Sequence, residues 1–206
     1  MYVCGVDEAG RGPVIGPLVM AAVSVQENQQ IPAGVTDSKK LSAKKREALY
    51  QQLIQLPHKI VVIPAREVDK AVHQQGLNWL EADHTAQLLA QLAPDKAILD
   101  CPSRNLQAYA EYVRERTTNV SVHAQFKADE EHAVVAAASI LAKVIRDQEV
   151  ARLREQAGFD FGSGYLTDPK TQVFLHEHFN KDFVGWRRSW KPYKQRLAQE
   201  NQQKLL

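Results

Sequence analysis

The chain of 206 residues lacks the features that mark several special classes of protein. Its two cysteines, Cys4 and Cys101, are too few for a disulfide framework and fit a reducing compartment. Its longest apolar run, Ala133 to Ala142, is interrupted by Ser139 and reaches about half the length of a bilayer span. No basic leader followed by an apolar stretch opens the chain, and no internal repeat is evident. We therefore expect a soluble cytoplasmic protein without a membrane segment.

The chain also lacks a strong excess of charge, since its formal net charge is only +2. The basic residues are nevertheless unevenly placed. Between Asp37 and Arg46 five basic residues accompany one acidic residue, and between Lys181 and Arg196 six accompany Asp182 alone. Either cluster by itself is most simply a solvated face. The two together favour a polyanion as the ligand.

Periodic apolar residues predict an alternation of strands and helices. We expect strands at 2–6, 18–25, 59–63, 97–100 and 120–124, and helices from the cap residue Ser42 through about Leu56, at 77–92 and at 105–116. Lys127 to Glu131 should lead into a long apolar helix that runs through about Glu155, with Asp129 at or near its N-terminus. A further helix should start at Pro169 behind the cap residue Asp168. This alternation favours an α/β fold in which helices flank a mixed sheet, followed by a small helical C-terminal extension.

Four carboxylates stand at the ends of these predicted elements: Asp7, Glu8, Asp100 and Asp129. Singly, an aspartate at a strand end or before a helix is most often a turn former or a cap. The adjacent pair is different, because it interrupts an apolar strand where a buried charge is costly unless it is paired or metal-bound. Oxygen ligands select Mg²⁺ or Mn²⁺, and no histidine and cysteine spacing suggests zinc. Two such ions about 4 Å apart would serve in-line phosphodiester displacement.

Adjacent side chains on a regular strand point to opposite faces of the sheet. Asp7 and Glu8 should therefore share one site only if the strand ends or bulges at Glu8, and the following Ala9 and Gly10 make an ending plausible. The stretch from Gly10 to Gly12 is by itself a tight turn and not a P-loop. Beside the carboxylates its glycines would let the backbone approach a sugar or phosphate, and Arg11 would bind a phosphate in a fork.

Several short blocks occur in the order found in the type 2 ribonucleases H. They are Asp7-Glu8-Ala9-Gly10-Arg11-Gly12-Pro13, Asp37-Ser38-Lys39-Lys40-Leu41, Lys127-Ala128-Asp129, Ala138-Ser139-Ile140-Leu141-Ala142-Lys143 with Arg146-Asp147, and Gly162-Ser163-Gly164-Tyr165. The chain thus resembles ribonuclease HII from about Val3 to Trp190, and it lacks the extra N-terminal domain of ribonuclease HIII. The resemblance implies a ribonuclease H-like catalytic domain at 1–165. It also implies a helical segment at 166–206 that assists duplex binding and frays from about 198.

The resemblance also implies roles for single residues. The four carboxylates match the family's ligands for two Mg²⁺ or Mn²⁺ ions, with Asp95 as a competitor for the place of Asp100. Gly10, Arg11 and Gly12 match the motif that recognises the ribose 2′-hydroxyl, and Tyr165 matches the tyrosine that packs on the next sugar. Ser38, Lys39 and Lys40 belong to a block that matches a phosphate-contacting loop. Ser139 and Lys143 lie four apart on one helix face and would touch the nucleic-acid backbone too.

The expected activity is metal-dependent cleavage of the RNA strand of RNA/DNA hybrids and of single ribonucleotides embedded in duplex DNA, leaving 5′-phosphate and 3′-hydroxyl ends. A backbone loop that bonds the 2′-hydroxyl would distinguish RNA from DNA without reading the base. One alternative is a DNA nuclease or transposase-like phosphoryl transferase on the same fold. Another is a nucleic-acid binding module without catalysis.

The basic C-terminal segment, with Arg187, Arg188 and Lys191, would grip duplex phosphates. Alternatively, its tryptophans Trp186 and Trp190 dock a terminal helix on the core, and both roles are compatible. The tail from Gln202 to Leu205 begins like a motif for a sliding clamp, though without the aromatic residues that would follow. We expect the protein to act as a monomer.

The cysteines offer a check on strand register. If the strands that end at Asp7 and Asp100 are parallel and level, Cys4 lies three residues back and Cys101 one residue forward. Four residues of strand put them about 13 Å apart, which is too far for a disulfide.

Overall fold

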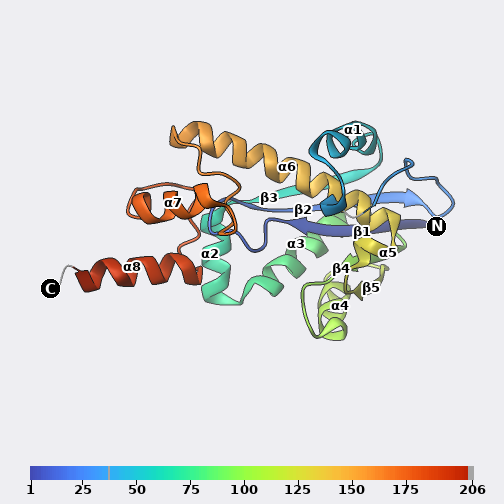
Figure 1. The fold of residues 1–206 in the computed structure, drawn as a ribbon. Helices are drawn as coiled ribbons and strands as arrows, with labels where there is room; N and C mark the ends of the chain where they lie inside the picture. Colours follow the sequence, from blue (N-terminus) through green and yellow to red (C-terminus); the bar gives the residue numbers. More distant parts are fainter. Residues whose placement is uncertain (37, 204–206) are drawn as a thin grey trace. The chain divides into compact units, whose positions relative to one another are not determined.

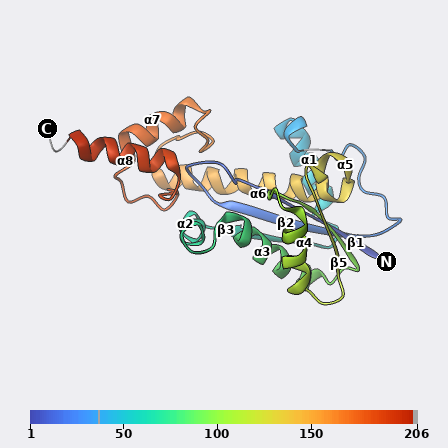
Figure 2. The same ribbon diagram turned by 90° about the horizontal axis from the view of Figure 1, so that it is seen from below.

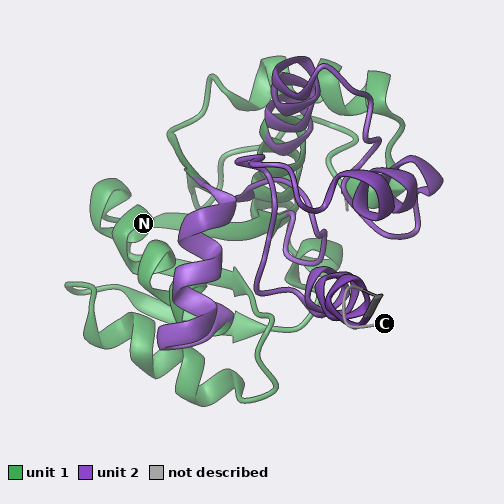
Figure 3. Ribbon diagram, turned by 90° about the vertical axis from the view of Figure 1, so that its left-hand side faces the viewer, with its two compact units in different colours: residues 1–9, 19–62, 78–145 green, residues 10–18, 63–77, 146–206 purple. Residues whose placement is uncertain are grey.

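The computed structural model describes residues 1–36 and 38–203. The chain divides into two compact units (Figure 3). The sheet unit comprises Met1–Ala9, Val19–Val62 and Asn78–Ile145, and the C-terminal unit comprises Gly10–Leu18, Ile63–Leu77 and Arg146–Leu206. The boundary predicted at residue 165 stays a prediction, and so does fraying of the tail from about residue 198.

Figure 1 labels the helices and strands in chain order. The strands are β1 (Tyr2–Ala9), β2 (Leu18–Gln26), β3 (His58–Ile63), β4 (Lys96–Asp100) and β5 (Ser121–Gln125). The α-helices are α1 (Ala43–Leu53), α2 (Ala65–Gln74), α3 (Leu77–Leu92), α4 (Leu106–Glu115), α5 (Ala128–Glu131), α6 (Ala133–Ala157), α7 (Pro169–His178) and α8 (Lys191–Gln203). A short 3₁₀ helix, η1, covers Ser38–Lys40. None of the helices in this described part of the chain combines the length and apolarity that a membrane crossing requires.

The five strands form one sheet in the order β3-β2-β1-β4-β5. Strand β1 is antiparallel to β2 and parallel to β4, and β4 is parallel to β5, so the predicted mixed sheet is confirmed. Val6 pairs with Leu99, which places Asp7 level with Asp100 as expected. Cys4 pairs with Ala97, four residues before Cys101, and both cysteines are free thiols.

Helices cover both faces of this sheet. Helix α1 and the first part of α6 lie on one face, and α3 and α4 lie on the other (Figures 1 and 2). Strand β2 is therefore buried on both sides along almost its whole length, and its sequence is apolar from Leu18 to Val23. Gly5 on β1 lies directly against α6, because a Cβ there would come within 2.4 Å of the Val134 backbone. Only glycine lets α6 approach the strand this closely.

Most predicted elements are present within two residues of their expected ends. Helix α1 begins behind Ser42, whose hydroxyl accepts a hydrogen bond from the Lys45 amide, and α7 begins behind Asp168, which accepts from the Lys170 amide. Helix α2 was not predicted. Its buried residues Ala65, Val68 and Ala71 recur every three positions, which is the spacing of one helix face.

The long apolar helix predicted through about Glu155 is present as α6. The residues that lead into it form a separate one-turn helix, α5, and His132 between the two helices is extended (φ −120°, ψ 111°). The side chain of Gln125 holds this break, because it donates to Glu131 and bonds the His132 ring. Asp129 consequently lies in α5 and not at the start of the long helix.

The C-terminal unit has its own apolar core. Its buried members are Val14, Ile15, Val150, Phe161, Phe174, Leu175, Phe179, Trp186 and Tyr193. Trp186 stacks on Phe174, with ring centroids 5.1 Å apart, and is 2% exposed. This burial supports the docking role for Trp186. Helix α8 continues through Gln203, past residue 198.

Candidate active site

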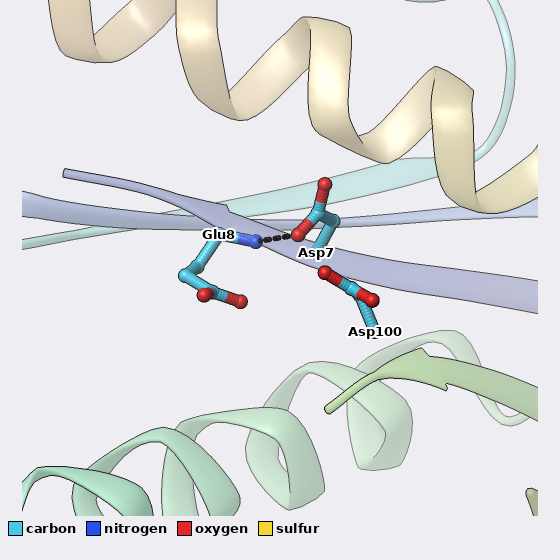
Figure 4. A group of neighbouring side chains, drawn as sticks. All are labelled: Asp7, Glu8 and Asp100. Carbon is cyan, nitrogen blue, oxygen red and sulfur yellow. Dashed lines mark hydrogen bonds between the residues drawn. The ribbon is translucent and has the colours of Figure 1, made fainter. Parts of the chain in front are cut away.

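Three of the four predicted carboxylates converge at the end of β4. One oxygen each of Asp7, Glu8 and Asp100 lies within 4.8 Å of the others. Figure 4 shows the Asp7 side chain pointing towards α6 and the Glu8 side chain pointing away from it, with Asp100 beside both. The competitor Asp95 bonds the Tyr2 amide at the opposite end of β1, so it lies outside this group.

The expectation that the strand must end or bulge at Glu8 is wrong. Strand β1 stays regular through Ala9, and both Asp7 and Glu8 keep their partners on β2, Ala21 and Met20. Adjacent side chains point to opposite faces, but the described pairing of β1 with β4 stops at Val6. Beyond Val6, β4 no longer covers the edge of β1. The Glu8 side chain, which is longer than that of Asp7, reaches this edge from the opposite face of the sheet.

Asp100 connects this group to α5. Its Oδ1 accepts a hydrogen bond of 2.9 Å from the amide of Ala128, the first residue of the helix. The next residue, Asp129, is 4% exposed, and its Oδ2 lies 3.8 Å from the Lys39 ammonium. Asp129 is thus held next to the residue that bonds Asp100, although the group of three does not include it.

Asp7 carries a strong electrostatic perturbation. Its pKa is raised well above the ordinary value of 3.8, first by burial and then by repulsion from Glu8 and Asp100. Hydrogen bonds from the Ser139 side chain and the Glu8 amide oppose this shift, and the amide donates over 2.7 Å. A site that gathers negative charge in this way, from oxygen donors alone, fits a hard divalent cation.

Ser38 and Ser139 form a buried pair behind Asp7. Each is 3% exposed, and their hydroxyl oxygens are 2.9 Å apart. The predicted contact of these serines with the nucleic-acid backbone stays a prediction. Their observed contact links η1 to α6 and, through Ser139, to Asp7.

Lysines surround the carboxylates at the surface. The side chains of Lys39 and Lys40 are 79% and 58% exposed, as a phosphate-contacting role requires. Lys40 and Lys127 both bond Glu130. Lys143, on the same helix as Ser139, is half-buried. Asp37, the first residue of the predicted phosphate-contacting block, lies outside the described residues.

In the C-terminal unit, the stretch from Gly10 to Gly12 forms a turn that needs glycine. Gly10 has φ +91°, and a Cβ there would lie 2.5 Å from the Pro17 carbonyl oxygen. Gly12 lies beside Tyr165, because a Cβ on it would be 3.6 Å from the tyrosine ring. The structure therefore brings the predicted 2′-hydroxyl motif and the predicted sugar-packing tyrosine together.

Arg146 is buried under these two segments. Its guanidinium donates to the Ser163 carbonyl over 2.6 Å and lies 5.0 Å from the centre of the Tyr165 ring. Its stem borders Gly10. Burial lowers the pKa of the Arg146 guanidinium. Arg146 belongs to one of the sequence blocks that resemble the type 2 ribonucleases H, but the resemblance implied no role for it.

The predicted duplex-binding residues have different environments. Arg188 and Lys191 are exposed, and Arg188 pairs with Asp182 at 3.3 Å. Arg187 is 0% exposed, which is at odds with a grip on phosphates at the surface. No pattern in the sequence indicates this difference, because the basic residues of the segment stand in similar surroundings along the chain.

Comparisons with known proteins agree with this geometry. The family model described as Ribonuclease HII matches residues 4–193. The ribonuclease HII of Picrophilus torridus is 42% identical over 197 residues, which is 94% of this chain and 96% of that protein. The ribonuclease H2 of Pyrococcus horikoshii superposes with a TM-score of 0.88 at 34% identity, covering 98% of this chain and 99% of that one.

The chain belongs to the ribonuclease HII family. It is therefore a metal-dependent endoribonuclease that cleaves RNA/DNA hybrids and ribonucleotides embedded in duplex DNA, and the predicted fold and activity are confirmed. A second ribonuclease HII, from Archaeoglobus fulgidus, superposes with a TM-score of 0.86 at 36% identity over 93% of this chain and 96% of that one. That structure is a complex with PCNA.

Proposed function

We propose that Asp7, Glu8, Asp100 and Asp129 hold two divalent ions, Mg²⁺ or Mn²⁺, at the end of β4. The convergence of three carboxylate oxygens within 4.8 Å is the observation that carries this proposal. When bound, such ions activate water and neutralise the charge that develops on the phosphate during in-line displacement. Asp129 is included because it is buried in α5, directly after the residue that bonds Asp100.

The remaining predicted residues would select and orient the substrate. The amides of the loop from Gly10 to Gly12 bond the 2′-hydroxyl of the ribose, and Tyr165 packs on the next sugar. The exposed ammonium groups of Lys39 and Lys40 bind the phosphate backbone, with Ser38, Ser139 and Lys143 completing that surface. Arg188 and Lys191, in the segment at 166–206, add contacts to the duplex. Cleavage leaves 5′-phosphate and 3′-hydroxyl ends.

A DNA duplex that carries one ribonucleotide tests this function directly. With magnesium, purified protein should cut on the 5′ side of the ribonucleotide, and an all-DNA duplex of the same sequence should stay intact. Mass analysis of the products identifies the end groups. Comparable cutting of both duplexes would favour the alternative of a DNA nuclease, and tight binding without cutting under any divalent ion would favour a binding module.

We also propose that the C-terminal tail contacts a sliding clamp. The support is the stretch from Gln202 to Leu205, of which Lys204 and Leu205 lie outside the described residues, and the PCNA complex of the Archaeoglobus fulgidus relative. Binding to an archaeal clamp should disappear when residues 202–206 are removed, while cleavage without the clamp persists. The same preparation should elute as a monomer.

A further inference from the structure

A buried arginine lies against the loop that precedes the apolar residues Val14 and Ile15. Arg187 is 0% exposed and is among the largest fully buried side chains of the described structure. Its guanidinium donates three hydrogen bonds to backbone carbonyls. Nε bonds Gly16 at 2.9 Å, Nη1 bonds Arg11 at 2.9 Å, and Nη2 bonds Gly10 at 2.5 Å.

This arrangement depends on the shape of the arginine side chain. A guanidinium carries five N–H donors in a rigid plane, so it can hold several carbonyls in fixed directions at once. A lysine ammonium is a compact charge on a flexible stem and would not reproduce that geometry. The identity of residue 187 is therefore tied to the path of the loop.

Trp190 extends the same contact by one residue. Its indole N–H points to the Gly12 carbonyl over 3.3 Å, and its ring lies over the Arg187 guanidinium at 4.8 Å. The carbonyls of three consecutive residues, from Gly10 to Gly12, are thus all held by a short segment near the end of the chain. Asp69 on α2 fixes that segment by accepting hydrogen bonds from the amides of Arg188 and Ser189.

The held carbonyls determine where the amides point. A trans peptide group is planar, and its N–H points opposite to its C=O. The carbonyls of Gly10 and Arg11 face Arg187, so the amides of Arg11 and Gly12 face away from it. These are the amides that the proposed function assigns to the ribose 2′-hydroxyl.

We propose that Arg187 is a positioning residue that, together with Trp190, orients the amides of Arg11 and Gly12 for the 2′-hydroxyl of the substrate. It acts through the loop and makes no contact with duplex phosphates. This inference rests on the proposed role of the loop in recognising ribose.

The experiment measures selectivity for ribose at the level of binding. Two fluorescent duplexes of one sequence are compared, one all-DNA and one with a single ribonucleotide, with a chelator present so that no cleavage occurs. The readout is the dissociation constant for the all-DNA duplex divided by the dissociation constant for the duplex with the ribonucleotide. In Arg187→Met the ratio should fall towards one, by up to about fivefold, the usual worth of one hydrogen bond. Affinity for the all-DNA duplex should stay unchanged.

Two further variants separate positioning from folding. Trp190→Phe keeps an aromatic ring and loses the indole N–H that bonds the Gly12 carbonyl, so the ratio should fall by about twofold. This variant decides the matter if Arg187→Met fails to fold. Tyr193→Phe loses a buried hydrogen bond of 2.9 Å to the Phe179 carbonyl in the same unit and should keep the wild-type ratio.

The possible failures are distinguishable. A wild-type ratio of one would refute the recognition of ribose itself and this inference with it. A wild-type ratio above one that both Arg187→Met and Trp190→Phe leave unchanged would refute only the positioning role. An equal loss of affinity for both duplexes in folded Arg187→Met would show that Arg187 grips the duplex and would also overturn the proposal.

Discussion

Asp7 in the sheet unit and two aspartates in the C-terminal unit, Asp160 and Asp168, have pKa values shifted in opposite directions. In the sheet unit, burial and neighbouring carboxylates raise the pKa of Asp7. In the C-terminal unit, hydrogen bonds from Lys170 and the Gly162 amide lower the pKa of Asp160 to about 2, and the Ser163 and Lys170 amides lower that of Asp168. The first arrangement is unfavourable until a cation joins it, whereas the second is already satisfied by the protein. The direction of the pKa shift therefore distinguishes the proposed metal ligand Asp7 from the structural aspartates Asp160 and Asp168.

The largest effect should come from removing the central charge of the sheet unit. Asp7→Asn should abolish detectable cleavage, a greater loss than the roughly hundredfold typical of a residue behind a metal ligand. Binding to an RNA/DNA hybrid should survive. Without metal, the variant should also unfold at higher urea concentration than wild type at neutral pH, because one of three mutually repelling charges is gone.

Asp168→Asn supplies the matched change in the other unit. Asparagine keeps one side-chain oxygen, so it cannot accept from both the Ser163 and the Lys170 amides as the two carboxylate oxygens do, and this variant should lose stability under the same conditions. If Asp7→Asn cleaves at a near-normal rate, Asp7 does not belong to the metal site. If both variants lose stability alike, the contrast between the units is wrong.

A second test strains the backbone of the loop from Gly10 to Gly12 without changing any charge. Gly10→Ala forces a residue with a Cβ into φ +91° and against the Pro17 carbonyl, so it should lower the free energy of unfolding by about 1–3 kcal/mol. Urea unfolding of the metal-free protein measures this loss. Gly12→Ala is the control, since its Cβ would make only an ordinary contact of 3.6 Å with Tyr165. Equal destabilisation by both substitutions would contradict the special role of Gly10.

The smallest effect concerns pH. The unfolded pKa of Asp7 is near 3.8 and the folded pKa is higher, so between them the folded protein binds more protons. The stabilisation that the Asp7 carboxyl contributes is fully present below about pH 3.8 and is lost as the pH rises through its folded pKa. One group changes the unfolding free energy by at most about 1.4 kcal/mol per pH unit.

The difference in unfolding free energy between metal-free wild type and Asp7→Asn, followed from pH 3.5 upward, isolates this contribution. It should grow in favour of the variant as the pH rises, and magnesium should reverse it. Asp160 and Asp168 act in the opposite sense at acidic pH but are common to both proteins, so they cancel. A difference that is flat across this range would refute the raised pKa.

Much of the candidate site could be predicted because Asp7 and Asp100 lie level on two neighbouring parallel strands. The ends of parallel strands fall together, so Asp7 and Asp100 had to be neighbours once β1 and β4 were paired. The reach of Glu8 could not be predicted, since it depends on where β4 leaves the sheet. The break at His132 was hidden in a run of good helix formers, and only the contacts of Gln125 reveal it.

The role of Arg187 was equally invisible in the sequence. Arg187, Arg188 and Lys191 form one basic cluster, and charge pattern alone treats them as equivalent. Tertiary packing separates them, because the first is buried against carbonyls of the loop and the others face solvent. A prediction from charge pattern describes a segment correctly and can still misassign its individual members.

The contacts of Arg187 join residues 171 to 177 positions apart in the sequence. During synthesis the loop is therefore made long before the side chain that holds its carbonyls. The four carboxylates of the proposed metal site all precede Arg187 in the sequence. The proposed metal site can thus be assembled on the growing chain before the loop proposed to recognise ribose is held in its final conformation.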